Sequence, residues 1–294
     1  MNWHSLPPVL FYAPIVPHVI WLCMKYNTSP ALIMSANPVF EFGGLPFSSK
    51  FSMHTNFAKV LPMAKLNVAD SLEKRLTISK EFSEKYTYPL IAKPDTGHRG
   101  VGVKKVNTET ELKDVLNEQS WDLVLQEYCD LDLEYGVFYY REPGEAQGRI
   151  ISLTKKVIPK GLDLVTASHC RGAIFTNAES LGTQELTNDL NFHLSDKDFY
   201  FGRLDVKAES DEALMRGDYK IIEINGATSE FIHIYDETSS WSYARKELRR
   251  QWSLLFKIAK LSQNKHGIKT TFYEFCRLYL EFFKKTRAAE GVLW

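Results

Sequence analysis

Residues 202–206 read GRLDV and residues 221–226 read IIEING, and these two stretches decide the fold. Both are short and rich in Ile, Leu or Val, so each predicts a β-strand. Side chains alternate between the two faces of a strand, which places Ile222 and Ile224 on one face and the polar side chains of that stretch on the other. The segment between the two, 208–218, is charged and loop-like. We therefore expect the two strands to pair as neighbours.

The polar faces of these strands form a candidate metal site. Arg203 and Asp205 share one face of the first strand, and Glu223 and Asn225 share one face of the second. Two carboxylates and an amide oxygen make the oxygen-only set that suits Mg²⁺. A solvated polar face is the alternative, but the flanking Ile and Val residues predict deep strands, where unpaired carboxylates are costly. We therefore expect Asp205, Glu223 and Asn225 to hold Mg²⁺.

A glycine-rich stretch, KPDTGHRGVG at 93–102, is a candidate phosphate-binding loop. Glycines let backbone N–H groups approach an anion, and a lysine at the end of the preceding strand adds a point charge. Here the glycines are Gly97, Gly100 and Gly102, and the lysine is Lys93. The stretch has neither the ending of a Walker loop nor the glycine-before-lysine order of a protein kinase. By itself it also fits an ordinary glycine-rich hairpin.

The stretch VLQEYCDLDLE at 124–134 predicts a strand end that passes into a loop. A purine could hydrogen-bond the backbone exposed there, and a carboxylate seven residues beyond the first acid could hold ribose hydroxyls. On its own this is an ordinary strand end.

The rest of the chain mixes predicted helices and strands. Apolar periodicity and capping signals predict helices, and short apolar runs between turn residues predict strands. Helices are expected at 49–88, 108–118, 241–262 and 272–285, and strands at 88–93, 101–106, 123–128, 135–140, 150–157, 200–206 and 219–224. Residues 160–195 give no assignment. Strands joined mostly by short turns, with helices between, predict an α+β fold.

Composition narrows the partners of the protein. Its 294 residues carry 36 basic and 36 acidic side chains, so net charge gives no reason to bind nucleic acid, and an anion site must be local. The four cysteines, at 23, 129, 170 and 276, stand far apart and form no CxxC pair. We expect free thiols in a reducing compartment.

An apolar segment at residues 6–24 leaves three alternatives open. It is long enough to suggest a membrane span, but it contains four prolines, which break the helix that a span requires. No basic stretch precedes it and no small-residue cleavage site follows it, which argues against a signal peptide. We expect it to be buried or to form a homodimer; contact with a membrane surface and a true span are the alternatives.

In combination, these motifs resemble the ATP-grasp superfamily, typified by D-alanine–D-alanine ligase and glutathione synthetase. The closer resemblance is to bacterial D-alanine–D-alanine ligase-like ATP-grasp proteins of unassigned substrate. It runs from about residue 8 to about residue 260 and is carried by the stretches LFYAPIVPHVIWL, SANP, YPLIAKPDTGHRGVGVKKV, GVFYYREPGEAQGRIISLTKK, FYFGRLDV, IIEINGATSE and IYDETSS. Their joint order is highly specific.

The resemblance implies an ATP-grasp fold, in which two α+β lobes grip ATP between them. Residues 1–48 would form a short apolar and loop-like N-terminal segment. Residues 49–262 would form the ATP-grasp domain, with lobe one at about 49–128 and lobe two at about 129–262. Residues 263–294 would form a C-terminal amphipathic helical tail.

The resemblance also implies roles for single residues. The nucleotide-binding positions are two lysines, the glycine loop, an adenine-hinge pair and a ribose acid, which here are Lys50, Lys93, Gly97, Gly100, Gly102, Glu127, Tyr128 and Glu134. Lys156 matches a lysine near the γ-phosphate, and Arg203 matches the arginine that steadies the transferred phosphoryl group. Asp205, Glu223 and Asn225 match the Mg²⁺ ligands.

The implied reaction is a ligation. A substrate carboxylate attacks the γ-phosphate of ATP to give an acyl phosphate, and an amine, thiol or hydroxyl then displaces phosphate. The expected partners are a small-molecule carboxylate and amine, and the expected location is the cytoplasm, with attachment to the inner membrane face as an alternative. A small-molecule kinase and a non-catalytic ATP-binding protein are the rival functions.

Two departures from the pattern leave the substrates open. The region before Lys50 is too short and proline-broken to be the N-terminal domain of D-alanine–D-alanine ligase, and the stretch at 158–185 looks shorter than in close relatives. Candidate specificity residues are Tyr140, Arg141, His169, Arg171, Ser229 and Glu230.

Overall fold

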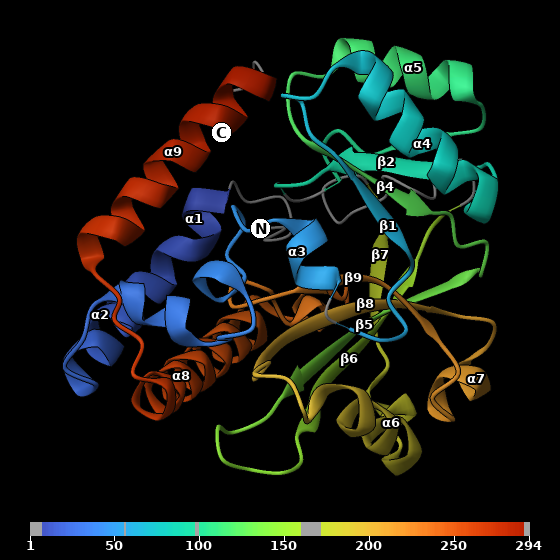
Figure 1. The fold of residues 1–294 in the computed structure, drawn as a ribbon. Coiled ribbons are helices and arrows are strands. Elements are labelled where there is room, and N and C mark those ends of the chain that lie inside the picture. Colours follow the sequence, from blue (N-terminus) through green and yellow to red (C-terminus); the bar gives the residue numbers. More distant parts are fainter. Residues whose placement is uncertain (1–7, 56, 98–99, 160–171, 291–294) are drawn as a thin grey trace.

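The computed structural model describes residues 8–55, 57–97, 100–159 and 172–290, with side chains described as far as residue 284. In this part of the chain, helices surround two sheets whose strands all pair antiparallel (Figure 1). The α+β fold expected from the sequence is therefore confirmed.

The first sheet has four strands in the order β1-β4-β2-β3. Its strands are β1 (Met63–Leu66), β2 (Leu90–Pro94), β3 (Lys104–Val106) and β4 (Leu123–Glu127), and two helices pack on it, α4 (Leu72–Tyr86) and α5 (Glu109–Glu118). Apolar side chains of both helices and all four strands form one buried cluster. The expected hairpin around the glycine-rich stretch is present, because β2 pairs with β3.

The single helix expected over 49–88 is wrong. Two separate helices occupy this stretch, α3 (Lys50–His54) and α4, and each begins at a serine whose side chain accepts a hydrogen bond from the first turn. Between them lies β1, whose main chain pairs with β4. The pairing partner is more than fifty residues away, so the local pattern could not show it.

The second sheet has five strands in the order β7-β6-β5-β8-β9. They are β5 (Leu133–Tyr140), β6 (Arg149–Val157), β7 (Ile174–Asn177), β8 (Phe201–Ala208) and β9 (Lys220–Asn225). One face packs on α6 (Gln184–Leu194) and α7 (Asp211–Met215). The polar residues of β8 and β9 lie on the other face. The boundary expected at 128/129 falls between the last strand of the first sheet and the first strand of the second.

The prediction that Ile222 and Ile224 share one face of β9 is wrong, because β9 contains a β-bulge. Asp205 pairs with Glu223, but the next residue of β8, Val206, pairs with Ile221, so Ile222 is the extra residue. A bulge interrupts the alternation of side chains. Ile221 and Ile224 are therefore buried in the core, whereas Ile222 lines a cavity between the two sheets instead of sharing a face with Ile224.

The N-terminal segment packs inside the fold. Its elements are α1 (Pro8–Tyr12), η2 (Ala13–Ile15), α2 (Val16–Lys25), η3 (Pro30–Ser35) and η4 (Glu41–Gly43). The elements η2, α2 and η3 pack on α8 (Trp241–His266), η4 packs on η3, and Phe11 of α1 contacts Trp241 of α8. Phe11, Ile15 and Leu22 are buried in the same core cluster as α8. Its other face is exposed at Leu10, Val16, Ile20, Trp21 and Met24.

Packing inside the fold thus holds for one face of the segment. Homodimer formation and membrane-surface contact through residues 6–24 stay predictions, and residues 6–7 lie outside the described part. Among the described helices, none is long and apolar enough to cross a membrane.

The last elements are η6 (Glu179–Leu181), η7 (Ile232–Tyr235) and α9 (Phe272–Glu290). Tyr279 and Phe282 of α9 pack against Phe47 of the N-terminal region, so the C-terminal helix closes back over the start of the chain (Figure 1). Cys23, Cys129 and Cys276 are free thiols, and Cys170 lies outside the described residues.

Candidate functional site

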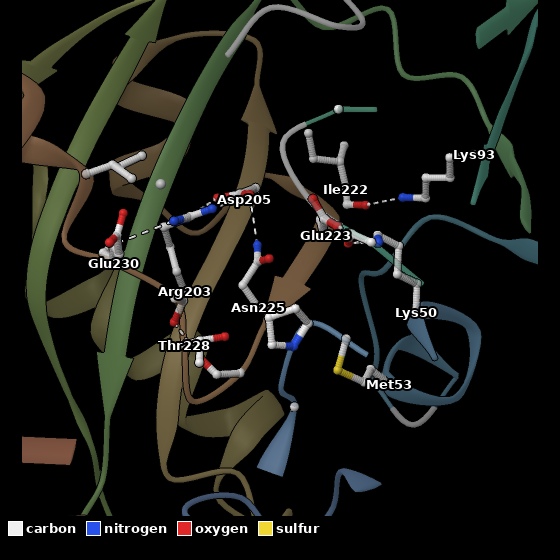
Figure 2. Close-up of a pocket in the computed structure, with 18 of the residues that line it drawn as sticks. Lys50, Met53, Lys93, Arg203, Asp205, Ile222, Glu223, Asn225, Thr228 and Glu230 are labelled. Carbon is white, nitrogen blue, oxygen red and sulfur yellow. Dashed lines mark hydrogen bonds and ion pairs between the residues drawn. The ribbon is translucent and has the colours of Figure 1, made fainter. Parts of the chain in front are cut away.

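A large cavity lies where the two sheets face each other. Its volume is about 880 Å³, and residues from both sheets, α3, α8 and α9 line it. We call it the central cavity. Figure 2 shows its charged wall, with Lys50 and Lys93 at one end, Asp205, Glu223 and Asn225 in the middle, and Arg203 and Glu230 at the other end.

Lys93 projects from β2 of the first sheet toward β9 of the second. Its Nζ lies 3.5 Å from the carbonyl oxygen of Ile222, the bulge residue, and its side chain is buried. Burial lowers the pKa of Lys93 to about 8, with Lys50 acting in the same direction, while Glu223 and Asp205 oppose the shift. The structure thus places Lys93 opposite the acids of the second sheet.

Lys50 comes from the first turn of α3 and reaches the same space. Its Nζ donates a hydrogen bond to the Gly97 carbonyl oxygen and lies 3.9 Å from a carboxylate oxygen of Glu223. Burial lowers its pKa, and Glu223 and Asp95 partly offset this. Two buried ammonium groups therefore converge on one carboxylate.

Asp95 links the start of α3 to Lys65 of β1, and it was not among the residues predicted from the sequence. Its side chain is 2% exposed and accepts hydrogen bonds from the Ser49 hydroxyl and the Phe51 N–H, both 2.9 Å, at the start of α3. It also pairs with Lys65, at 3.0 Å. Its place two residues after Lys93 was the available signal.

The glycine-rich stretch reaches the cavity in part. Gly97 and Gly100 line the cavity wall, but Gly102 does not; a Cβ there would lie 2.8 Å from a ring carbon of Pro94. All three have positive φ, of 123°, 69° and 71° in chain order, which explains the need for glycine. Residues 98 and 99 lie outside the described part.

Arg203 and Asp205 lie side by side on β8, as the alternation predicted, and bond each other. Arg203 Nε and Nη2 donate to the two carboxylate oxygens of Asp205 at 2.6 and 3.0 Å, and Asn225 donates to the same carboxylate at 2.9 Å. Burial alone would lower the pKa of Arg203, but Asp205 and Glu223 more than reverse this. Arg203 is therefore held as a fixed cation.

Glu223 lies directly across from Asp205 in the paired strands. Burial alone would raise its pKa, but Lys50, Lys93, Arg203 and Lys156 together hold that pKa below its usual value. Glu223 therefore stays ionised in the middle of the cavity wall.

Glu134 and Lys156 are paired with each other in the structure. They face each other across β5 and β6, and their charged groups lie 2.7 Å apart. Burial raises the pKa of Glu134, and Lys156 opposes that shift. The resemblance implied a ribose acid and a γ-phosphate lysine, which contact different parts of ATP, so this pair would have to open for both roles to hold.

The expected adenine hinge lies at the end of β4. Glu127 and Tyr128 both line the cavity, and the ammonium of Lys105 lies 3.8 Å from the centre of the Tyr128 ring. The preceding residue, Gln126, donates from Nε2 to the Ile222 carbonyl oxygen at 3.1 Å and so joins the two sheets.

His54 is a second positioning residue that the sequence argument missed. Its Nε2 accepts a hydrogen bond, 2.8 Å long, from the N–H of Ile224 in β9. Burial, with Lys93 and Lys50, lowers its pKa well below the usual value, so the ring is a neutral acceptor. It fixes β9 beside the acids.

The candidate specificity residues divide into two groups. Ser229 and Glu230 line the cavity. Tyr140 and Arg141 do not, and the Arg141 guanidinium instead donates to the main-chain oxygens of Glu145 and Lys197. The remaining two, at 169 and 171, lie outside the described residues.

Solved structures that are similar to this chain include two ligases and a synthase complexed with ATP. VanG D-Ala:D-Ser ligase from Enterococcus faecalis matches with a TM-score of 0.45 and 16% identity, over 69% of this chain and 61% of that one. The D-alanine-D-alanine ligase from Coxiella burnetii gives 0.44 and 13%, over 75% and 56%. The carboxyaminoimidazole ribonucleotide synthase from Aspergillus clavatus, complexed with ATP, gives 0.43 and 12%, over 64% and 47%.

The chain thus spans less than two thirds of the length of these neighbours. Similarity this low concerns the fold alone. No protein-family model matches the chain, and no curated protein matches it.

Proposed function

We propose that this protein is an ATP-grasp enzyme, an ADP-forming ligase that activates a carboxylate with Mg-ATP and joins it to an amine, thiol or hydroxyl. The observation that carries the proposal is the central cavity, where both sheets contribute buried cations around a set of acids. The sequence resemblance supports the same function independently.

The phosphates of ATP would lie at the end of the cavity that holds Lys50 and Lys93. The hydrogen bond from Lys93 Nζ to the Ile222 carbonyl oxygen is 3.5 Å long, which is long for a buried ammonium group. Phosphate oxygens would supply closer, charged acceptors. Gly97 and Gly100 lie on the same wall and can present backbone to the same anion.

Asp205, Glu223 and Asn225 fit a Mg²⁺ ion that is held jointly with phosphate. The described residues contain no group of three or more His, Cys, Asp or Glu placed to hold a metal, so the protein alone offers two carboxylates and an amide. Mg²⁺ bound to nucleotides commonly takes one or two carboxylates, with phosphates and water completing the shell. When bound there, the ion would neutralise charge on the phosphates.

The base and ribose would extend along the end of β4. Glu127, Tyr128 and Glu134 all line the cavity, and the sequence resemblance implies that Glu134 is the ribose acid. We propose that Glu134 serves the ribose once its pair with Lys156 opens.

Arg203 and Lys156 would act on the transferred phosphoryl group. Asp205 fixes the guanidinium plane through two hydrogen bonds, so Arg203 needs little reorganisation to meet developing negative charge. Protection of an acyl phosphate from hydrolysis would require that water is excluded from this part of the cavity.

The test is the stoichiometry of products. The protein is incubated with Mg-ATP and pools of small carboxylates and amines, and ADP, free phosphate and organic phosphate are measured together. A ligase forms ADP and free phosphate in equal amounts, and only when both substrates are present. ADP with a stable phosphorylated organic product would instead show a kinase, and nucleotide binding without turnover would show a non-catalytic protein.

A further inference from the structure

The central cavity continues beyond Arg203 into a region with a different character. Its walls there include Tyr12, Phe175, Ile232 and Tyr235, three aromatic rings and one aliphatic side chain. These residues come from the N-terminal segment, β7 and η7. We call this region the aromatic compartment.

One carboxylate, that of Glu230, faces this compartment. The Tyr12 hydroxyl donates to one of its oxygens, and the Tyr235 hydroxyl donates to the other at 2.8 Å. Burial raises the pKa of Tyr235 well above its usual value, with Glu230 and Tyr12 adding to the effect, so this hydroxyl stays protonated as a donor. Two neutral donors thus fix the orientation of the carboxylate.

The carboxylate of Glu230 has no ion-pair partner in the described part of the chain. No Lys, Arg or His side chain of that part lies within 4.0 Å of it. The Arg203 guanidinium, 3.4 Å away from the main-chain oxygen of Glu230, is bound to Asp205. A carboxylate has about four acceptor positions, so two tyrosine donors leave room for further donors.

We propose that the aromatic compartment binds a primary ammonium group carried on an apolar body, with Glu230 as the residue that recognises the charge. Arg203 attracts the Glu230 carboxylate without bonding it, and a partly buried carboxylate that lacks a direct cation partner is costly. An ammonium would compensate it through charge-assisted hydrogen bonds. Aromatic faces attract the same cation, and the apolar walls suit the body that carries it.

This inference rests on the proposed function and names its second substrate as the amine. Because Arg203 contacts the main chain of Glu230, an amine held by Glu230 lies next to the place where the carboxylate would be activated. A carboxylate substrate would be drawn instead to the cations, Arg203 and Lys156. Arg203 and Lys156 would therefore bind the carboxylate substrate, and Glu230 would bind the amine substrate.

The experiment measures binding of hexylammonium, hexanoate and hexanol by titration calorimetry, without nucleotide. These probes share a chain of the same length and differ in charge. The wild-type protein should bind hexylammonium at least about tenfold more tightly than the other two, which is the scale of a charge-assisted hydrogen bond. A short peptide amide with an apolar free N-terminus, added as a fourth probe, tells whether the amine comes from a small molecule or a peptide.

Two variants test whether Glu230 causes the preference for hexylammonium. Glu230→Gln keeps the size of the side chain and an acceptor oxygen for one of the two tyrosines, removes the charge, and should lower hexylammonium affinity about tenfold or more. Glu142→Gln is the matched control, because Glu142 pairs with Lys257 outside the cavity and should change nothing. Melting temperature is measured for all three proteins, so that misfolding is not mistaken for lost recognition.

Equal binding of the three hexyl probes by the wild type would overturn the inference, and so would a folded Glu230→Gln protein with unchanged hexylammonium affinity. Mg-ATP binding is measured on the same samples. If Mg-ATP binds and hexylammonium does not, the amine assignment fails alone; if Mg-ATP does not bind, the proposed function fails.

Discussion

Replacement of Lys93 by methionine should make the protein more stable and less able to bind ATP. Lys93 is 6% exposed, and burial lowers its pKa from the usual 10.5 to about 8. A difference of that size corresponds to about 3 kcal/mol of cost for keeping the charged form in the folded state. Methionine has a similar shape without the charge, so at pH 7 Lys93→Met should raise the free energy of unfolding by up to about 3 kcal/mol.

The pH dependence of the free energy of unfolding tests the direction of this stability change a second time. Below pH 8 the lysine is protonated in both folded and unfolded states, and the folded state bears the full cost. Between about pH 8 and pH 10.5 the folded state loses the proton first, so wild-type stability rises relative to the variant. The stability difference between variant and wild type should therefore shrink toward zero across this window.

The affinity for Mg-ATP should move in the opposite direction. If Lys93 contacts phosphate, its loss removes a charge-assisted hydrogen bond, which is worth about tenfold to a hundredfold in affinity. The assays are guanidinium unfolding at pH 7, 9 and 10.5, and calorimetric titration with Mg-ATP. Lys104→Met is the matched control, since Lys104 lies on the same hairpin with an exposed side chain and should leave both quantities nearly unchanged.

Unchanged Mg-ATP affinity in Lys93→Met would refute the phosphate role. A stability difference that stays constant from pH 7 to pH 10.5 would refute the account of a buried charge.

The remaining predictions concern other parts of the fold. Glu223→Gln should reduce turnover at least about a hundredfold and also lower the melting temperature, because it removes the carboxylate that faces buried Lys50 and Lys93. Asp205→Asn should also reduce turnover and should destabilise the fold by about 3 kcal/mol, because it leaves buried Arg203 without its partner. Wild-type turnover in both variants would remove the metal assignment. Gly100→Val should lower turnover, because its φ of 69° is a conformation that valine rarely adopts, and circular dichroism checks that the fold persists. Deletion of residues 1–25 should give insoluble protein, because burial of Phe11, Ile15 and Leu22 stabilises the fold by about 1.5–3 kcal/mol for each side chain. A soluble, folded product would show that the segment is dispensable. Sedimentation of the full chain with liposomes tests membrane contact.

Local sequence patterns predicted much of the second sheet. In GRLDV and IIEING, alternation sufficed to place Arg203 on one face with Asp205, and Glu223 on one face with Asn225, because both strands are regular over these residues. The register that sets Glu223 opposite Asp205 came only from the structure. The bulge beyond it depends on how β9 fits its partner, and no local signal marked Ile222 as the extra residue. Its carbonyl oxygen nevertheless meets both Lys93 and Gln126 from the other sheet.

Long-range contacts were beyond the sequence argument. Tyr12 meets Glu230 across 218 positions, and His54 meets Ile224 across 170, so neither pairing has a local pattern. The four-residue strand β1 was missed for a similar reason, since MAKL is too short for periodicity and depends on its pairing with β4. The resemblance assigned Glu134 and Lys156 to separate tasks, and only the structure revealed that they bond each other.

The most direct test of the central claim is a crystal structure of the protein with Mg²⁺ and a non-hydrolysable ATP analogue. We predict that the triphosphate lies in the central cavity within hydrogen-bond distance of Lys50 and Lys93, with the metal bound by Glu223 and by Asp205 or Asn225. A nucleotide bound outside the cavity, or a cavity that stays empty at saturating analogue, would contradict the account.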